Sequence, residues 1–230
     1  MLTIATFNIK NNYNDYNDQK ANIIVRFLKN KKVDVLCFQE LFDKCHNDLL
    51  KRVPKNYKFY GRYRYKLKIF RKINECVDIL TNKNVIGDKT YKLPYLPSTL
   101  KRIVEVVDIK TKSGEVVSII NTHLDFKFRL SKKRQLKRII RIIKSKNNKI
   151  VLTGDFNCKM NHDILKDFVK ELEKLNIKRV NVCEKTLKCS KYNRAIDHVF
   201  VSNDIKVKSF EVVKDLPISD HYPIVVKVVV

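Results

Sequence analysis

The sequence predicts a mixed-sheet sandwich of the α/β or α+β class, on three observations. Short apolar runs of strand length recur along the whole chain, amphipathic helical patterns separate several of them, and other strands are joined through turns as hairpins. The 230 residues contain no internal repeat and no linker rich in Pro, Gly or Ser. We therefore expect a single domain over residues 1–230, long enough to bury a sizeable core.

The first half of the chain begins with a strand, a loop and a helix. An apolar run over 2–8 predicts the first strand, and a polar loop separates it from a helical pattern over 19–30. The segment 34–40 predicts the next strand, and a short helix is expected near 43–53. The long stretch 57–123 is mostly extended, so it supplies several strands to the predicted sheets.

The second half combines a hairpin with helices and further strands. The segments 102–110 and 115–124 flank a Gly-containing turn and predict the hairpin. The remaining expected elements are a helix over 130–145, a strand over 149–153, a helix over 162–175 and strands over 195–202, 205–214 and 222–230. Helices between strands favour parallel pairs and hairpins give antiparallel pairs, so we expect mixed sheets.

The chain is strongly basic. It carries 49 Lys and Arg against 24 Asp and Glu, a formal net charge of +25. This excess favours a polyanionic partner, which means nucleic acid (DNA or RNA), an anionic membrane or a phosphorylated substrate. Coding drift in an A+T-rich genome also produces a chain rich in Lys, Asn and Ile with only 4 Gly and no Trp. Composition leaves both explanations open, and it indicates no protein partner.

The cysteines and the chain start predict a cytoplasmic protein. The six cysteines show no CxxC pair and no zinc-ligand spacing, so we expect reduced thiols. The first strand begins at Leu2, which leaves no room for a signal peptide. The longest apolar runs are far too short to span a bilayer. We therefore expect a soluble protein of the cytoplasm.

The segment "GDFN" at 154–157 places polar side chains directly after an apolar strand. Asp155 and Asn157 are two residues apart, so both side chains are expected on the same face at the end of the strand. Gly154 permits a positive φ or a close backbone approach just before the carboxylate. Taken alone, the segment fits an ordinary Asp/Asn turn as well as an active site.

Other predicted strands carry, at or next to one of their ends, side chains that bind metals or transfer protons. These residues are Asn8, Glu40, His123, Asp197, Asp220 and His221. A single residue of this kind usually has a structural role, whereas several at different strand ends indicate one shared site. The oxygen-rich set suits Mg²⁺ or Mn²⁺ better than zinc.

Three further histidines are expected to lie outside this site. In an extended strand the side chain of His198 points opposite to that of Asp197, so His198 is predicted to pack in the interior or against a neighbouring layer. His46 and His162 lie in polar helical segments and are predicted to be surface residues.

Six short motifs follow one another across nearly the whole chain. They are "TFNI" at 6–9, "QE" at 39–40, "NTHLD" at 121–125, "GDFN" at 154–157, "IDHVF" at 196–200 and "SDHYPI" at 219–224. In this ordered set the chain resembles the endonuclease/exonuclease/phosphatase superfamily, which has the DNase I-like fold. The resemblance implies a four-layer sandwich of two mixed β-sheets flanked by helices, and a hydrolase of phosphodiester bonds that depends on Mg²⁺ or Mn²⁺.

The resemblance also implies roles for the residues around the metal and the water. Glu40 would bind the divalent metal, Asn8 would position it or the phosphate, and Asp220 would complete the metal shell. Asp155 and Asn157 would orient and deprotonate the attacking water.

Further roles implied by the resemblance concern the phosphate. His221 would donate to a nonbridging oxygen, held by Asp197, whose carboxylate favours the charged imidazolium. His123 would contact the phosphate from the other side or assist the leaving group. Arg102 and Arg134 are the expected substrate-binding residues, since the segment that contains Arg134 resembles the Arg/Gln-bearing helix of the family.

The segment 57–72, "YKFYGRYRYKLKIFRK", interleaves cations with aromatic residues. Such a segment suits a surface that stacks on bases and contacts phosphates. The same alternation is typical of a half-buried strand with one solvated cationic face. The helix over 130–145 likewise combines an apolar stripe with a cationic remainder.

We expect a nuclease that acts on DNA or RNA. The alternative is a phosphoesterase that acts on lipid headgroups, as sphingomyelinases do, or on small phosphorylated molecules. Apurinic-site specificity is not expected, because "NIKNN" and "YNRAID" depart from the pattern of that branch. A catalytically silent binding protein on the same fold is disfavoured by the intact set of site residues.

Overall fold

The structure, a computed structural model, describes all residues except 11–17, 66–74, 97–99, 181–183 and 189–193. Its helices within this part of the chain are α1 (Asp18–Lys31), α2 (Asp43–Arg52), α3 (Arg129–Lys144) and α4 (Asp163–Glu173). The strands are β1 (Leu2–Asn8), β2 (Val35–Phe42), β3 (Lys58–Tyr65), β4 (Glu75–Thr81), β5 (Asn84–Lys92), β6 (Ile103–Lys110), β7 (Val116–His123), β8 (Lys149–Asp155), β9 (Ile177–Arg179), β10 (Asp197–Ser202), β11 (Lys206–Val212) and β12 (Ile224–Val229).

The strands form two six-stranded mixed sheets. The first has the order β11-β12-β1-β2-β4-β3 and the second the order β5-β6-β7-β8-β10-β9. One parallel pair lies in each sheet, β1 with β2 and β7 with β8, and the other pairs are antiparallel. Asn8, Glu40, His123 and Asp155 lie at or near the carboxyl ends of β1, β2, β7 and β8, whereas Asp197 opens β10 and Asp220 and His221 precede β12.

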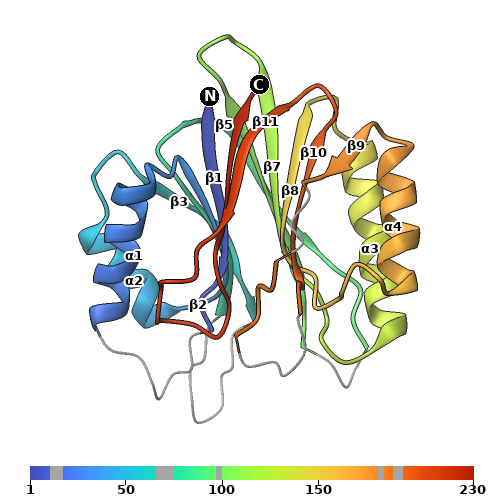
Figure 1. The fold of residues 1–230 in the computed structure, drawn as a ribbon, viewed down its shortest axis with the longest axis horizontal. Coiled ribbons are helices and arrows are strands. Elements are labelled where there is room, and N and C mark those ends of the chain that lie inside the picture. Colours follow the sequence, from blue (N-terminus) through green and yellow to red (C-terminus); the bar gives the residue numbers. More distant parts are fainter. Residues whose placement is uncertain (11–17, 66–74, 97–99, 181–183, 189–193) are drawn as a thin grey trace.

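Four layers result from the way these sheets and helices pack (Figure 1). Aliphatic side chains such as Ile4 and Ile119 fill the space between the two sheets. The outer face of the first sheet packs against α1 and α2 through residues such as Leu28, and that of the second packs against α3 and α4 through residues such as Phe168. The predicted four-layer sandwich of two mixed sheets flanked by helices is confirmed.

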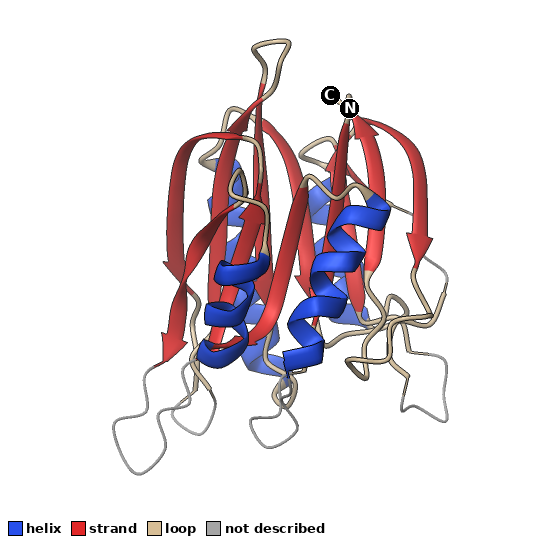
Figure 2. Ribbon diagram, turned by 90° about the vertical axis from the view of Figure 1, so that its left-hand side faces the viewer, coloured by secondary structure: helices blue, strands red, loops and turns tan. Residues whose placement is uncertain are grey.

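Both chain termini lie at the same end of the sandwich (Figure 2). This follows from the pairing of β1 with β12, in which Leu2 lies opposite Val228. Because β1 begins there and ends at Asn8, the strand end that carries Asn8 lies at the opposite end of the molecule from the termini.

The sequence places most elements within a few residues of their observed bounds. It missed β9, which has three residues and is too short to show a periodic pattern. In the basic aromatic segment 57–72, β3 confirms the predicted strand as far as Tyr65. The remainder, 66–72, lies outside the described residues, as do the side chains of residues 62–65.

The excluded histidines differ in their surroundings. His198 is fully buried and its Nε2 lies 2.8 Å from the Cys158 carbonyl oxygen, as the interior packing predicted. His162 is exposed at the N-cap of α4. The prediction for His46 is wrong in part, because its ring packs 4.4 Å from that of Phe59 and is only partly exposed.

Two further observations bear on expectations from composition. The cysteines that the structure describes as free thiols, Cys37, Cys45, Cys76 and Cys158, are all buried, whereas Cys183 and Cys189 lie outside the described residues. None of the described helices has the length and apolar character needed to cross a bilayer.

Candidate active site

The candidate site lies where β7, β8 and β10 place three titratable residues side by side. In the register of the second sheet, His123 pairs with Asp155, and Asp155 pairs with Asp197. The close approach of β7 and β8 depends on Gly154, whose φ is +142°. A Cβ at this position would lie 2.0 Å from the Thr122 carbonyl oxygen, so the glycine meets the predicted need for close backbone approach.

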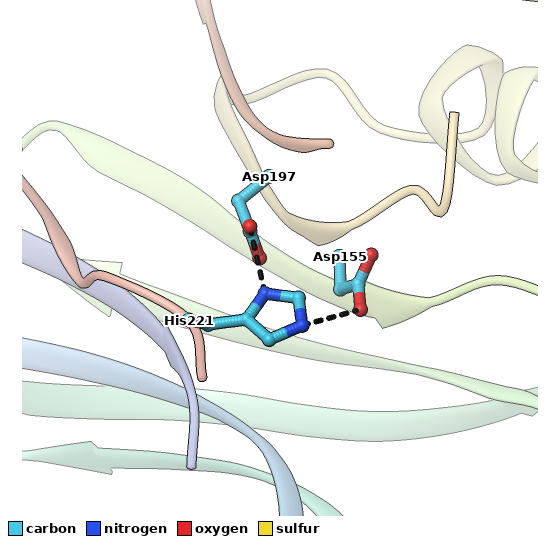
Figure 3. A group of neighbouring side chains, drawn as sticks. All are labelled: Asp155, Asp197 and His221. Carbon is cyan, nitrogen blue, oxygen red and sulfur yellow. Dashed lines mark hydrogen bonds and ion pairs between the residues drawn. The ribbon is translucent and has the colours of Figure 1, made fainter. Parts of the chain in front are cut away.

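Asp155 is the centre of the side-chain cluster. Its Oδ2 accepts a hydrogen bond from Asn8 Nδ2 at 3.0 Å, across the interface between the two sheets. The Nε2 atoms of His123 and His221 lie 3.6 and 3.9 Å from the same oxygen. Figure 3 shows His221 between Asp155 and Asp197. The carboxylate is 1% exposed, so these neighbours replace water around it.

His221 is held by Asp197. Its Nδ1 lies 2.9 Å from Asp197 Oδ2, and its backbone amide donates to Ser219 Oγ. Burial by itself would lower the pKa of His221, but the charge and hydrogen bond of Asp197, followed by the charges of Asp155 and Asp220, raise it to about 10. His221 is therefore an imidazolium at neutral pH.

Asp155 has the opposite electrostatic balance. Burial and the neighbouring Asp197 carboxylate raise the pKa of Asp155 to about 7, against the lowering effects of His221, of the Asn157 backbone amide and of Asn8. A carboxyl group whose pKa lies near neutrality has the proton affinity expected of a general base that works at that pH.

Glu40 reaches the cluster from the first sheet. In β2 the register with β4 shifts between Phe38 and Leu41, and Glu40 has a φ of +58°. Such an irregularity redirects a side chain, and here Glu40 Oε1 lies 3.3 Å from Asn8 Nδ2 and 3.8 Å from His123 Nε2. The Glu40 side chain keeps 27% of its surface exposed, so it faces both the cluster and solvent.

Asp220 and Lys10 lie at the edge of this group. Lys10 Nζ lies 2.5 Å from Asp220 Oδ2, and the Lys10 backbone amide donates to Asn8 Oδ1. The other Asp220 oxygen, Oδ1, is buried without a hydrogen-bond partner among the described residues. A buried carboxylate oxygen of this kind suits an additional donor or a cation.

Asn157 lies two residues beyond the end of β8 and has a φ of +48°. Its backbone amide donates to Asp155 Oδ1 at 2.8 Å, while its side-chain Nδ2 donates to the Leu124 carbonyl oxygen at 3.1 Å. The described contact between Asp155 and Asn157 therefore involves the backbone of Asn157, and its side chain ties this turn to the residue after β7.

The two expected substrate-binding arginines differ in their surroundings. Arg102 is 3% exposed. Burial would raise the pKa of Asp125, but the backbone amides of Phe128 and Lys127, with Ser131 and the charge of Arg102, lower it. Arg102 thus acts on a buried structural carboxylate. Arg134 is exposed on α3, and none of the described hydrogen bonds or ion pairs connects it with the cluster.

Sequence reasoning missed Glu75, a buried residue whose Oε1 lies 3.9 Å from His123 Nδ1. Glu75 opens β4, and β4 is antiparallel to β2. The first residue of an antiparallel strand lies at the same sheet edge as the last residue of its neighbour. The signal that could have identified Glu75 is its position as an acidic residue at the beginning of a strand.

The donor set fits a hard divalent cation. Ligand atoms of Asp155, Asp197 and His221 all lie within 4.8 Å of one another, a spacing that could hold a metal ion. His221, however, is protonated at neutral pH and already bonded to Asp197, so it is a poor ligand. Glu40, with its partly exposed carboxylate, and the buried Asp220 Oδ1 offer the oxygen ligands that Mg²⁺ and Mn²⁺ prefer.

A sandwich of two mixed sheets with a buried Asp, an Asp-bound imidazolium and a partly exposed Glu at one end has the architecture of the DNase I-like class. The sequence matches the Endonuclease/Exonuclease/phosphatase family over residues 5–221, and the chain belongs to this family of phosphoesterases. No curated protein sequence gives a significant match.

Solved structures share the fold across the whole chain. The mannosyl-6-phosphatase of Bacteroides thetaiotaomicron is 22% identical, covers 100% of both chains and has a TM-score of 0.86. The catalytic domain of human Nocturnin, solved with a bound sulfate anion, is 17% identical, covers 99% of this chain and 94% of its own, and has a TM-score of 0.78. D. rerio TDP2, solved with a single-strand DNA product, is 16% identical with coverages of 100% and 99% and a TM-score of 0.77.

Proposed function

We propose that this phosphoesterase is a divalent-metal-dependent phosphodiesterase that hydrolyses DNA or RNA. The observation that carries the proposal is a pair of neighbouring groups with different proton affinities. The carboxyl group of Asp155 has a pKa of about 7, and the imidazolium of His221 places its Nε2 3.9 Å from Asp155 Oδ2. Hydrolysis needs a base for water and a cation for the phosphoryl oxygens, and this pair supplies both.

The reaction follows from these positions. Asp155, oriented by Asn8 and the Asn157 turn, takes a proton from water as the water oxygen bonds to phosphorus. His221, fixed by Asp197, donates a hydrogen bond to a nonbridging oxygen, where negative charge grows. The bond from phosphorus to the ester oxygen breaks, and His123 assists the departing alkoxide.

Glu40 is proposed as the principal metal ligand, with Asp220 and Asn8 beside it. A bound Mg²⁺ or Mn²⁺ supplies Lewis-acid neutralisation of the phosphoryl charge. Asn8 Nδ2 donates to both Glu40 and Asp155, and Lys10 pairs with Asp220, so an amide and an ammonium group lie between the carboxylates.

The choice of nucleic acid rests on charge. The chain has 49 Lys and Arg against 24 Asp and Glu, and the resulting net charge of +25 attracts a chain of phosphates. The same charge would also attract an anionic membrane, which is the basis of the lipid-headgroup alternative.

Small phosphorylated molecules form a second candidate substrate class. The similarity to the mannosyl-6-phosphatase of Bacteroides thetaiotaomicron covers the full length of both chains, which favours considering a sugar phosphate. At 22% identity that similarity supports the fold, so the candidate ranks below nucleic acid.

The test offers five substrates to the purified protein: supercoiled plasmid, single-stranded DNA, RNA, mannose 6-phosphate and sphingomyelin vesicles, each with Mg²⁺, Mn²⁺ or EDTA. Asp155→Asn should lose turnover by about a hundredfold or more, since it removes the general base, while its melting temperature stays close to that of the unaltered protein. Asp204→Asn is the matched control, because Asp204 is 57% exposed. Hydrolysis of mannose 6-phosphate or sphingomyelin without cleavage of any nucleic acid would reject the nuclease.

A further inference from the structure

Two exposed aromatic side chains, Tyr95 and Phe126, lie on loops beside the candidate active site. Phe126 is 63% exposed and Tyr95 is 47% exposed. Phe126 follows β7 and Tyr95 follows β5, so the two residues come from different parts of the second sheet.

The position of Phe126 is set by its short connection to the catalytic cluster. His123 ends β7, and the next residue, Leu124, donates its backbone amide to the Asp155 carbonyl oxygen at 2.9 Å. Phe126 comes three residues after His123, so their Cα atoms are at most about 11 Å apart. Lys132 Nζ donates to the carbonyl oxygens of both Phe126 and Asn157, which joins this loop to the water-activating turn.

The loop that carries Phe126 is firmly held. Asp125 is buried, and its Oδ1 accepts hydrogen bonds from the backbone amides of Lys127 at 2.7 Å and Phe128 at 3.0 Å. The backbone on both sides of Phe126 is therefore fixed while its ring remains in solvent. A rigid exposed ring loses little conformational entropy when a ligand stacks on it.

A single buried side chain links the two loops. Gln135 Oε1 accepts from the Asp125 backbone amide at 2.9 Å, and Gln135 Nε2 donates to the Pro94 carbonyl oxygen at 3.0 Å. Phe126 and Tyr95 are the residues that directly follow these two bonded positions. Gln135 is fully buried, so the relative position of the two loops is defined by hydrogen bonds that solvent does not weaken.

Cations lie on both loops. Lys101 Nζ lies 5.9 Å from the centre of the Tyr95 ring. Lys127 directly follows Phe126, is exposed, and places its Nζ 5.1 Å from the centre of the Phe128 ring. Exposed rings interleaved with ammonium groups next to a phosphoester site match the two demands of single-stranded nucleic acid, which are base stacking and phosphate neutralisation.

We propose that Tyr95 and Phe126 form a base-stacking platform that binds the nucleotides next to the scissile phosphate of a single strand, with Lys101 and Lys127 against the neighbouring phosphates. The proposal deepens the proposed nuclease function and rests on it for the identity of the ligand. Leu100 and Leu130 are also exposed, so contact of the same surface with an anionic membrane is the alternative that the experiment must separate.

The experiment compares two probes in EDTA, where binding is read without turnover. One is an oligothymidylate, and the other is an abasic oligomer of the same length and charge. Binding is measured by fluorescence anisotropy for the unaltered protein, for Tyr95→Ala/Phe126→Ala and for Phe210→Ala. Phe210 is the matched control, because it is 40% exposed on β11, in the other sheet.

The unaltered protein and Phe210→Ala should bind the oligothymidylate at least about tenfold more tightly than the abasic oligomer, a difference of about 1.4 kcal/mol. In the double variant this ratio should fall toward one. A ratio near one in the unaltered protein, or a ratio that the double variant leaves intact, would overturn the platform. Vesicles of phosphatidylserine and phosphatidylcholine provide the other arm, and a loss confined to vesicle binding would replace the platform with a membrane contact.

A second readout is independent of the double variant's stability. The chain has no Trp, so Phe126→Trp carries a sole tryptophan. Its emission should be quenched by the oligothymidylate and not by the abasic oligomer, and equal responses would contradict stacking. Failure of the proposed function is separate: absence of nucleic-acid hydrolysis with Mg²⁺ or Mn²⁺, alongside a preserved base preference in EDTA, would reject the nuclease and retain the platform.

Discussion

At the scale of single residues, the three carboxyl groups of the site lie in different surroundings. Asp197 is bonded to an imidazolium, Asp155 is buried with a pKa raised to about 7, and Glu40 is partly exposed to solvent. Three chemically similar groups thereby acquire different tasks, since each has different neighbours and a different exposure to solvent.

Glu40→Gln tests the assignment of the metal ligand. The substitution keeps an oxygen for Asn8 Nδ2 but removes the negative charge, so the Mg²⁺ concentration for half-maximal activity should rise at least about tenfold. The stabilisation of the protein by Mg²⁺ or Mn²⁺ in thermal melting should weaken in parallel. Glu115→Gln, at an exposed ion pair with Lys149, is the control, and an unchanged metal requirement in Glu40→Gln would remove Glu40 from the metal site.

The His221–Asp197 pair predicts a pH dependence of stability in EDTA. The folded-state pKa of His221 is about 10, against an ordinary value of 6.5. Because the folded pKa is raised, the stabilisation is fully present below pH 6.5 and is lost as pH rises toward 10. Urea unfolding of the unaltered protein should therefore show a free energy that falls between about pH 7.5 and 9.5.

His221→Gln is the comparison for that measurement. Above about pH 7.5 Asp155 is already largely ionised in the folded protein, and the buried thiols, whose pKa burial raises, contribute to both proteins alike, so the difference between the two slopes reports His221. The variant should be less stable at the lower pH and show a shallower slope. Parallel curves for the two proteins would contradict a charged His221.

At the scale of elements, the parallel pair β7 and β8 brings His123 beside Asp155, and a glycine makes that pairing possible. Gly154→Ala should lower the free energy of unfolding by about 3 kcal/mol or more, since a Cβ there would lie 2.0 Å from the Thr122 carbonyl oxygen and φ is +142°. Urea unfolding measures the loss.

Gly114→Ala separates the two causes of that loss. Gly114 has a φ of +88°, and a Cβ there meets nothing within 4 Å. It should cost only about 1 to 2 kcal/mol, from backbone conformation alone. Similar losses in both variants would show that steric contact between β7 and β8 contributes little.

Strand ends were well predicted because short apolar runs and polar termini are local signals. The strands Leu2–Asn8 and Lys149–Asp155 show both, and Asn8 and Asp155 lie where the apolar runs stop. Glu40 was found by its motif, but its positive φ in an irregular pairing could not be, because register with β4 is a tertiary property.

Other features escaped prediction for related reasons. Glu75 is at the beginning of an antiparallel strand, and its contact with His123 arises only when the two sheets pack. Arg102 was predicted to bind substrate, and the sequence did not indicate that the fold buries it near Asp125. Contacts between distant segments decide these cases, and a single sequence carries no local mark of them.

At the scale of the whole molecule, the positive charge has two explanations: a surface that binds phosphates, or coding drift in an A+T-rich genome. A net +25 with cations on strands and helices alike is compatible with both. The two explanations differ in how binding responds to salt, because only specific phosphate contacts release counterions in fixed number.

The affinity for an oligothymidylate, measured in EDTA by anisotropy, should fall at least about tenfold between about 50 and 200 mM monovalent salt, which corresponds to about three phosphate contacts on a single strand. A methylphosphonate oligomer of the same sequence, which lacks backbone charge, should bind weakly and show little salt dependence. A shallow slope for both oligomers would mean that the positive charge is dispersed without forming a phosphate-binding surface, and the substrate would then be sought among small phosphoesters that the Asp155 cluster can hold by itself.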